Sequence, residues 1–227
     1  YLYNNFSEDN YLEILKPYID QNIVTLVDWP FEGGQFTSYE HFYDFYRNET
    51  EWVSFLDLDE FITPIKKKTI QEWLKDYSNF PCIVLYWKMF STSGKIEHDF
   101  DKLTIEQYTV SWNKLNTVGK VLLNTNYNIS KFDSGVHHAT EISVKFLGMT
   151  FIIPPINEFK FFLKWDIHRT NSILNVENTI QINHYWSKSL QYYFNNKVMR
   201  GDINNHERTI NTFYIVESKA KDQDFKI

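Results

Sequence analysis

The chain has 227 residues and a mass of 27.4 kDa, with 43% hydrophobic and 23% charged residues. A chain of this size and composition can bury a full hydrophobic core, which excludes a disordered or fibrous protein and fits one large domain. The net charge of −6, without an extended basic run, argues against nucleic-acid binding.

The first half of the chain alternates helix-like and strand-like segments. The predicted elements are a helix over 7–19, a strand over 23–27, a helix beginning near 37, a strand over 52–56, a helix beginning near 69 and a strand over 82–87. Apolar strands separated by amphipathic helices are typical of an α/β protein with a mostly parallel sheet covered by helices on both faces. Such sheets bind ligands at the carboxyl ends of their strands.

Local capping chemistry predicts where three of these helices begin. Ser7 or Asp9 is expected to cap the first helix. Ser/Thr-x-x-Glu capping boxes start at Thr37 and Thr69 and predict the other two.

The second half is less regular. Residues 90–155 mix short strands with polar turns and are expected to form an insertion. A clearer unit follows, with a strand over 180–184 and a helix capped by Ser187 and ended by Gly201. We expect one domain over 1–217 and a frayed charged tail over 218–227.

The strongest local signal for function is an apolar run that leads directly into Asp57, Asp59 and Glu60. Side chains two apart on an extended chain point to the same side, so Asp57 and Asp59 can face one cation. Carboxylate oxygens suit Mg²⁺ or Mn²⁺. A solvated turn after a strand explains the pair equally well when the pair is taken alone.

A second signal lies near the end of the chain, where His184 closes a predicted strand. At this position, the histidine suits a nitrogen ligand for the same cation, contributed from late in the chain. A structural role is commoner for a single histidine. Lys188, Lys197 and Arg200 follow on the next predicted helix and could neutralise a diphosphate or form an exposed basic face.

Two further segments have weaker signals. A strand feeds a small-residue loop from Trp87 to Gly94, which suits close approach to a sugar or forms a simple turn. His137 and His138 are adjacent, so on a strand only one of them could face a substrate or a metal. Packing is an equal alternative for this pair.

Taken together in order, these motifs resemble the glycosyltransferase family 2-like and family 92 group of GT-A enzymes. The resemblance covers residues 3 to about 201 and is carried by Tyr3–Asp9, Trp52–Ile62, Trp87–Gly94, Lys120, His137-His138, Asn183–Ser189, Lys197 and Arg200-Gly201. It implies a Rossmann-like GT-A domain whose first strand and helix precede Tyr3, with residues 90–155 as an acceptor-side insertion. It also implies a hexosyltransferase that moves a sugar from a nucleotide-sugar, with a UDP-sugar favoured, to a glycan acceptor.

The resemblance implies a role for each matching residue. The expected metal ligands for Mn²⁺ or Mg²⁺ are Asp57, Asp59 and His184. The expected nucleotide and diphosphate contacts are Asn5, Ser7, Asp9, Lys188, Lys197 and Arg200. The expected sugar and acceptor contacts are Trp87, Ser93, Gly94 and His137.

An inverting displacement needs a carboxylate general base near the acceptor hydroxyl. Glu106 is preferred and Asp99 is the second choice, with Glu97 and Asp133 as further candidates on the acceptor side. Two other functions remain as alternatives. One is a haloacid-dehalogenase-like phosphotransferase with Asp57 as nucleophile, and the other is a non-catalytic carbohydrate-binding protein.

The expected location is the cytoplasm. The single cysteine, Cys82, lies in an apolar run and has no partner for an internal disulfide, which fits a reducing compartment. No apolar segment reaches the roughly 18 residues of a membrane span. Peripheral membrane association through flanking segments outside this sequence is the alternative.

Overall fold

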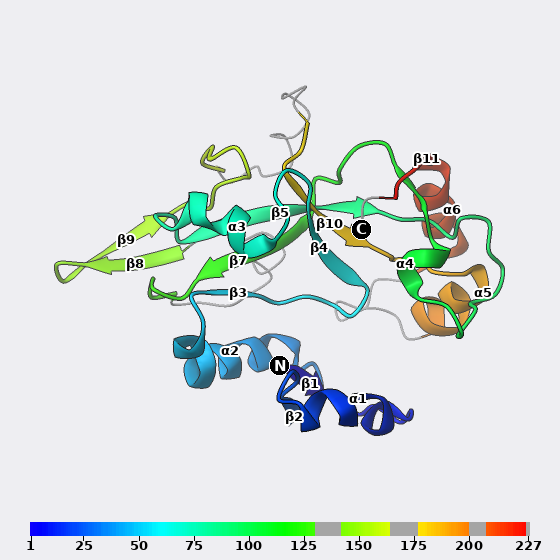
Figure 1. Cartoon of the computed structure of the whole chain (residues 1–227), viewed down its shortest axis with the longest axis horizontal. Helices are drawn as coiled ribbons and strands as arrows, with labels where there is room; N and C mark the ends of the chain where they lie inside the picture. Colours follow the sequence, from blue (N-terminus) through cyan, green and yellow to red (C-terminus); the bar gives the residue numbers. More distant parts are fainter. Residues whose placement is uncertain (130–141, 164–176, 200–207, 226–227) are drawn as a thin grey trace. The chain divides into compact units, whose positions relative to one another are not determined.

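The computed structural model describes residues 1–129, 142–163, 177–199 and 208–225. The chain forms two compact units, Tyr1–Thr50 and Glu51–Ile227, which are described separately (Figure 1). Its mixture of helices and strands confirms the predicted α/β class. The single domain over 1–217 stays a prediction.

The first unit is built on a β–α–β motif. Strands β1 (Leu2–Asn4) and β2 (Leu26–Asp28) pair in parallel, and helix α1 (Tyr11–Asp20) connects them. Helix α2 (Gln35–Tyr46) follows and continues into a 3₁₀ turn, η1, over Arg47–Glu49. The sequence predicts the helix, strand and helix of this unit in that order, but it does not predict strand β1.

The helix starts in this unit differ from the prediction. Helix α1 begins after Asn10 without a side-chain cap, so neither Ser7 nor Asp9 caps it. Helix α2 begins after Gly34, two residues before the predicted box at Thr37. The reason is a tight turn at Gly34, where a Cβ would lie 2.8 Å from the carbonyl oxygen of Phe31 and 2.9 Å from the Trp29 ring. This turn fixes the helix start, and the Thr37 hydroxyl donates back to the Gly34 carbonyl.

The second unit contains a five-stranded mixed sheet in the order β3-β7-β5-β10-β4. These strands are β3 (Trp52–Ser54), β4 (Glu60–Pro64), β5 (Cys82–Met89), β7 (Gly119–Asn124) and β10 (Ile180–His184). Only β5 and β10 pair in parallel, and the other three pairings are antiparallel. The predicted mostly parallel pairing is therefore not found in this sheet.

The connections explain the mixed pairing. Strand β7, from the segment expected to be an insertion, lies between β3 and β5 and runs opposite to both, so β3 and β5 share one direction. Residues 55–59 carry the chain directly from edge strand β3 to the opposite edge strand β4. This short crossing segment passes the ends of the three inner strands, and Asp57 and Asp59 lie in it.

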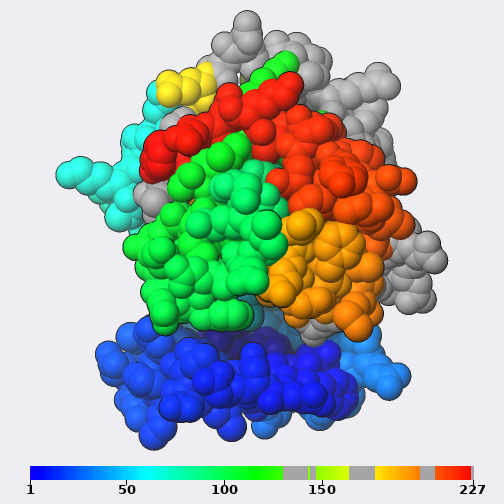
Figure 2. All heavy atoms as spheres, turned by 90° about the vertical axis from the view of Figure 1, so that its right-hand side faces the viewer, coloured from blue at the N-terminus to red at the C-terminus, as the bar shows by residue number. Residues whose placement is uncertain are grey.

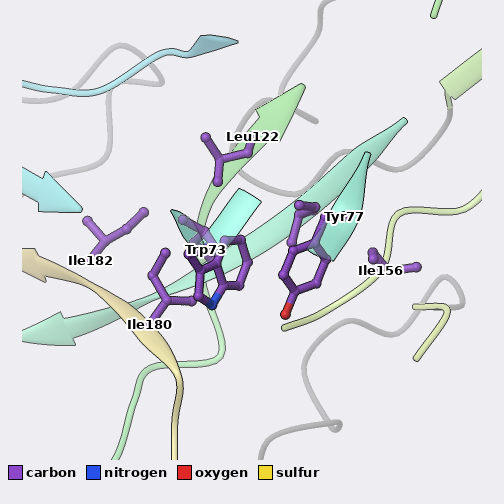
Figure 3. Packing of buried hydrophobic residues seen from close by; sticks show 8 residues of the cluster. Trp73, Tyr77, Leu122, Ile156, Ile180 and Ile182 are labelled. Atoms are coloured by element: carbon purple, nitrogen blue, oxygen red, sulfur yellow. The ribbon is translucent and has the colours of Figure 1, made fainter. Parts of the chain in front are cut away.

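One face of the sheet carries the main hydrophobic core (Figure 3). Helix α3 (Ile70–Leu74) and the 3₁₀ turn η2 (Lys75–Tyr77) place the stacked rings of Trp73 and Tyr77 there, 4.0 Å apart at their centroids. The sheet contributes Ile83, Leu85, Leu122, Ile180 and Ile182, and Ile156 completes the cluster. The predicted cap at Thr69 is confirmed, since its hydroxyl accepts a hydrogen bond from Glu72 N at 3.1 Å.

Shorter elements surround the sheet. They are α4 (Thr104–Gln107), β6 (Val110–Trp112), the hairpin of β8 (Ile142–Phe146) and β9 (Met149–Ile153), α5 (Leu190–Tyr192), the π-helix η5 (Tyr193–Val198), α6 (Ile210–Lys219) and β11 (Ala220–Gln223). Among the described residues, no helix has the length and hydropathy needed to cross a membrane.

Two predictions in the C-terminal region are wrong. The cap of α5 is Ser189, which accepts from Tyr192 N at 3.1 Å, and not Ser187. The segment expected to be a frayed tail instead forms β11, which pairs with β6 and lies over residues near 110 (Figure 2). Pairing with a strand more than 100 residues earlier gives this charged segment an order that its composition does not indicate.

Candidate functional site

The crossing segment between β3 and β4 contains both predicted aspartates. Leu58 is 84% exposed, whereas Asp59 is buried and the Asp57 side chain is 42% exposed. A turn fixes the segment, because Glu60 N donates to the Asp57 carbonyl and Asp57 N donates to the Glu60 carboxylate, both at 3.0 Å. Tyr185 N donates to the Asp59 carbonyl at 2.9 Å, which ties the segment to the end of β10.

Asp59 contacts His184, a predicted ligand of the same metal, and Lys197, which was predicted to contact the diphosphate. His184 Nε2 lies 3.6 Å from Asp59 Oδ1, and Lys197 Nζ donates to Asp59 Oδ2 at 2.8 Å. Burial disfavours the charged form of Asp59, but the positive charge of Lys197, with smaller effects of His184 and Lys188, outweighs burial and lowers its pKa. Asp59 is therefore an ionised carboxylate at neutral pH.

The imidazole of His184 is buried and held neutral. Burial lowers its pKa to about 4, with the Asp59 carboxylate opposing this shift. Its Nδ1 atom has no hydrogen-bond partner among the described residues. Trp87 packs against it, with ring centroids 4.6 Å apart. A neutral imidazole beside an ionised carboxylate has the protonation state that metal coordination requires.

Asp57 belongs to a second charge cluster, whose members were not predicted to meet. Lys120 on β7 is 1% exposed, and its Nζ lies 3.3 Å from Asp57 Oδ2 and 3.5 Å from Glu60 Oε2. Burial raises the pKa of Glu60 to about 7, although Lys120 opposes the shift. The available signal was a single charged residue inside the apolar run of β7, which demands a buried counter-charge.

The other predicted basic residues have different surroundings. Lys188 adopts a left-handed backbone conformation (φ 48°), and its Nζ lies 4.5 Å from the centroid of the Tyr192 ring. A non-glycine residue in that region is strained, which is common at functional sites. Arg200 lies outside the described residues.

The predicted sugar-side loop is tightly held. Ser93 and Gly94 both have positive φ values, 53° and 77°. The Ser93 hydroxyl accepts hydrogen bonds from two backbone amides of the 109–110 segment, each at 2.9 Å. The Glu217 carboxylate on α6 accepts from the Thr92 hydroxyl at 2.8 Å and from Thr92 N at 3.0 Å. Of this predicted set, Trp87 reaches the Asp59 cluster directly, and His137 lies outside the described residues.

The two preferred general bases have local structural contacts. Glu106 accepts from Leu103 N at 3.0 Å and closes the first turn of α4. Asp99 pairs with Lys102 at 3.0 Å, and that hydrogen bond lowers its pKa. The general-base role of either residue stays a prediction.

The predicted nucleotide contacts Asn5, Ser7 and Asp9 lie in the first unit, directly after β1. Asn5 Nδ2 donates to the carbonyl oxygens of Trp29 and Phe31 at 2.7 and 2.9 Å. Ser7 N donates to Asn4 Oδ1 at 3.1 Å. These bonds form an exposed turn at the carboxyl end of a parallel strand, which is where open α/β sheets bind ligands.

The residues that are described hold no group of three His, Cys, Asp or Glu side chains arranged for a metal ion. Asp59 and His184 nevertheless offer an oxygen and a nitrogen 3.6 Å apart. Mn²⁺ and Mg²⁺ usually take few protein ligands and complete their shells with waters and substrate phosphates. The pair therefore fits part of such a site, and Lys197 already places a positive charge there.

Comparison with known proteins identifies the family of the chain. Residues 1–212 match the model of glycosyltransferase family 92. The chain belongs to glycosyltransferase family 92. A family 92 protein of rice, Oryza sativa subsp. japonica, is 33% identical over 84 residues, which are 37% of this chain and 14% of the rice protein. The chain therefore spans only a small part of the length of this relative.

Proposed function

We propose that this family 92 chain is the catalytic part of a metal-dependent glycosyltransferase. It would transfer a hexose from a nucleoside-diphosphate sugar, with a UDP-sugar favoured, to a glycan acceptor with inversion. The observation that carries this proposal is that His184 and Lys197 both contact the Asp59 carboxylate. They follow Asp59 in the chain by 125 and 138 positions, so the fold brings distant segments together at this carboxylate.

We further propose a GT-A arrangement of the fold. The first unit has the β–α–β motif of a nucleotide-binding half, with a polar turn after β1. In the second unit, β3 and β5 run in the same direction on either side of β7, and the acids follow β3. These features support the proposal, although most pairings in the second sheet are antiparallel.

Asp59 and His184 would hold the divalent ion, with Asp57 as a further oxygen ligand nearby. When bound, the ion supplies electrostatic stabilisation of the leaving diphosphate. Lys197 and Lys188 would bind the phosphate oxygens and neutralise the charge that develops as the bond to the anomeric carbon breaks. Trp87, against His184, would border the sugar and exclude water from the reacting centre.

The acceptor hydroxyl would attack the anomeric carbon from the face opposite the diphosphate, and a carboxylate would take its proton. Glu106 or Asp99 remains the proposed base. Either would have to leave its local hydrogen bonds with Leu103 or Lys102. The cytoplasm stays the expected location.

Calorimetry with UDP-sugars and GDP-sugars, with and without Mn²⁺, tests the proposal directly. We expect Mn²⁺-dependent binding of one nucleotide class. Asp59→Asn should abolish this binding, whereas Asp76→Asn, at an exposed aspartate paired with Lys67, should leave it unchanged. Nucleotide binding that is equally tight without Mn²⁺, or is unaffected by Asp59→Asn, would refute the metal-dependent mechanism.

A further inference from the structure

Lys197 forms the closest contact to the Asp59 carboxylate. Its Nζ lies 2.8 Å from Oδ2, while Oδ1 faces His184 Nε2 at 3.6 Å. The side chains are 17% exposed for Lys197 and 11% exposed for Asp59, so water screens the pair only in part. A charge-assisted hydrogen bond in such surroundings is stronger than one at the surface.

This contact creates a conflict for any second cation. A divalent ion between Asp59 and His184 would share the carboxylate with an ammonium group that already binds one of its oxygens. Two cations on one carboxylate repel each other, and the repulsion is large where the dielectric constant is low. Binding of the ion is therefore easier once Lys197 has another anion to contact.

The diphosphate of the donor is such an anion. Resting on the proposed function, we infer that Lys197 is a displaceable internal cation that couples metal binding to donor binding. Without nucleotide, Lys197 occupies Asp59 and weakens metal binding. With nucleotide, Lys197 moves to the phosphate oxygens and frees the carboxylate. Metal and donor then bind strongly only together.

The position of Lys197 in the fold suits a movable role. It lies in the π-helix η5 (Tyr193–Val198), which directly follows the single turn of α5 (Leu190–Tyr192). π-Helical turns are rare and are frequent at functional sites. Lys120, by contrast, is 1% exposed on the inner strand β7 and has no comparable freedom.

The inference predicts effects of opposite sign for one substitution. Lys197→Met keeps most of the length and the apolar character of the side-chain stem but removes its charge. We expect Mn²⁺ affinity in the absence of nucleotide to rise at least about tenfold, since one charge-assisted bond no longer competes. We expect affinity for UDP in the presence of Mn²⁺ to fall at least about tenfold, because a phosphate contact is lost. The factor by which UDP strengthens Mn²⁺ binding should therefore shrink.

Free Mn²⁺ measured by electron paramagnetic resonance gives the first affinity, and calorimetry with UDP gives the second. Lys16→Met is a matched control, because Lys16 pairs with Asp20 at 3.0 Å but both side chains are well exposed. Adding Asp59→Asn to Lys197→Met should remove the gain in Mn²⁺ affinity. That result would show that the gain acts through this carboxylate.

Three outcomes separate the two proposals. Opposite shifts in Lys197→Met, absent in Lys16→Met, support the coupling role. If wild-type protein binds Mn²⁺ with UDP but Lys197→Met does not raise affinity for Mn²⁺ alone, the coupling role is wrong and the proposed function stands. If wild-type protein binds no Mn²⁺ even with saturating UDP, the metal-dependent function fails, and the coupling role fails with it.

Discussion

Replacing Lys120 with methionine should destabilise the second unit strongly. Lys120 is 1% exposed, and it is the cation nearest to the fully buried Glu60 carboxyl, at 3.5 Å. Glu60 Oε1 has no hydrogen-bond partner among the described residues. Lys120→Met therefore leaves a buried acid without its counter-charge. Breaking a buried ion pair from one side typically costs about 3–5 kcal/mol.

Two features of the cluster place the expected loss at the lower end, about 3 kcal/mol. The Asp57 side chain is 42% exposed, so water compensates it when Lys120 is removed. Burial already raises the pKa of Glu60 to about 7, and loss of Lys120 raises it further, so Glu60 can escape the penalty by binding a proton.

Urea unfolding monitored by tryptophan fluorescence measures the loss. The double variant Lys120→Met/Glu60→Gln should recover much of the stability, because neither buried charge then remains. Lys67→Met is the control, since Lys67 and Asp76 form an exposed pair 3.8 Å apart, and it should change stability little. A Lys120→Met variant within 1 kcal/mol of wild type, with an unchanged urea slope, would refute the argument.

Three further predictions follow from other contacts. Glu158→Ala removes the acceptor for two hydrogen bonds from Thr179 and should cost about 2–4 kcal/mol in urea unfolding, with Glu158→Gln costing less than half as much. Glu217→Ala frees the Thr92 amide and hydroxyl and should speed hydrogen exchange in the loop that follows. Gly119→Ala places a Cβ 1.8 Å from a β5 carbonyl oxygen and should abolish soluble expression, which a solubility assay checks.

The sequence predicts the elements whose signals are local. Strands β5 and β10 form where expected, because the local pattern of hydrophobic residues marks each of them. Helix α3 begins where expected, because the Thr69 hydroxyl caps it. Strand β11 was missed because its residues are charged, and only its pairing with β6 orders it. The antiparallel pairing was also missed. Strand β7 lies between β3 and β5, but it comes from a segment whose hydrophobic residues show no clear periodicity.

The site divides in the same way. Asp59 and His184 could be predicted as partners because each lies at or just after the end of a predicted strand. Their side chains are 3.6 Å apart in the structure. The binding of Lys120 to Asp57 and Glu60 was not predicted, since it depends on how the crossing segment passes β7. Residue type indicates which groups have chemistry, but the sheet order decides which of them meet.

The two lysines of the site have different roles that one experiment can separate. Lys120, at 1% exposure on an inner strand, is a fixed counter-charge, whereas the Lys197 side chain is 17% exposed and lies in a short π-helix. Lys197→Met leaves Asp59 without its closest cation, so a divalent ion should replace the missing charge. Because a ligand that binds the folded state stabilises it more when its affinity is higher, Mn²⁺ should raise the melting temperature of Lys197→Met more than that of wild type. The same addition should leave the loss in Lys120→Met largely unrepaired, because the acid that loses its counter-charge there, Glu60, is fully buried. Equal rescue of both variants by Mn²⁺ would show that the lysines are interchangeable counter-charges and would contradict this division of roles.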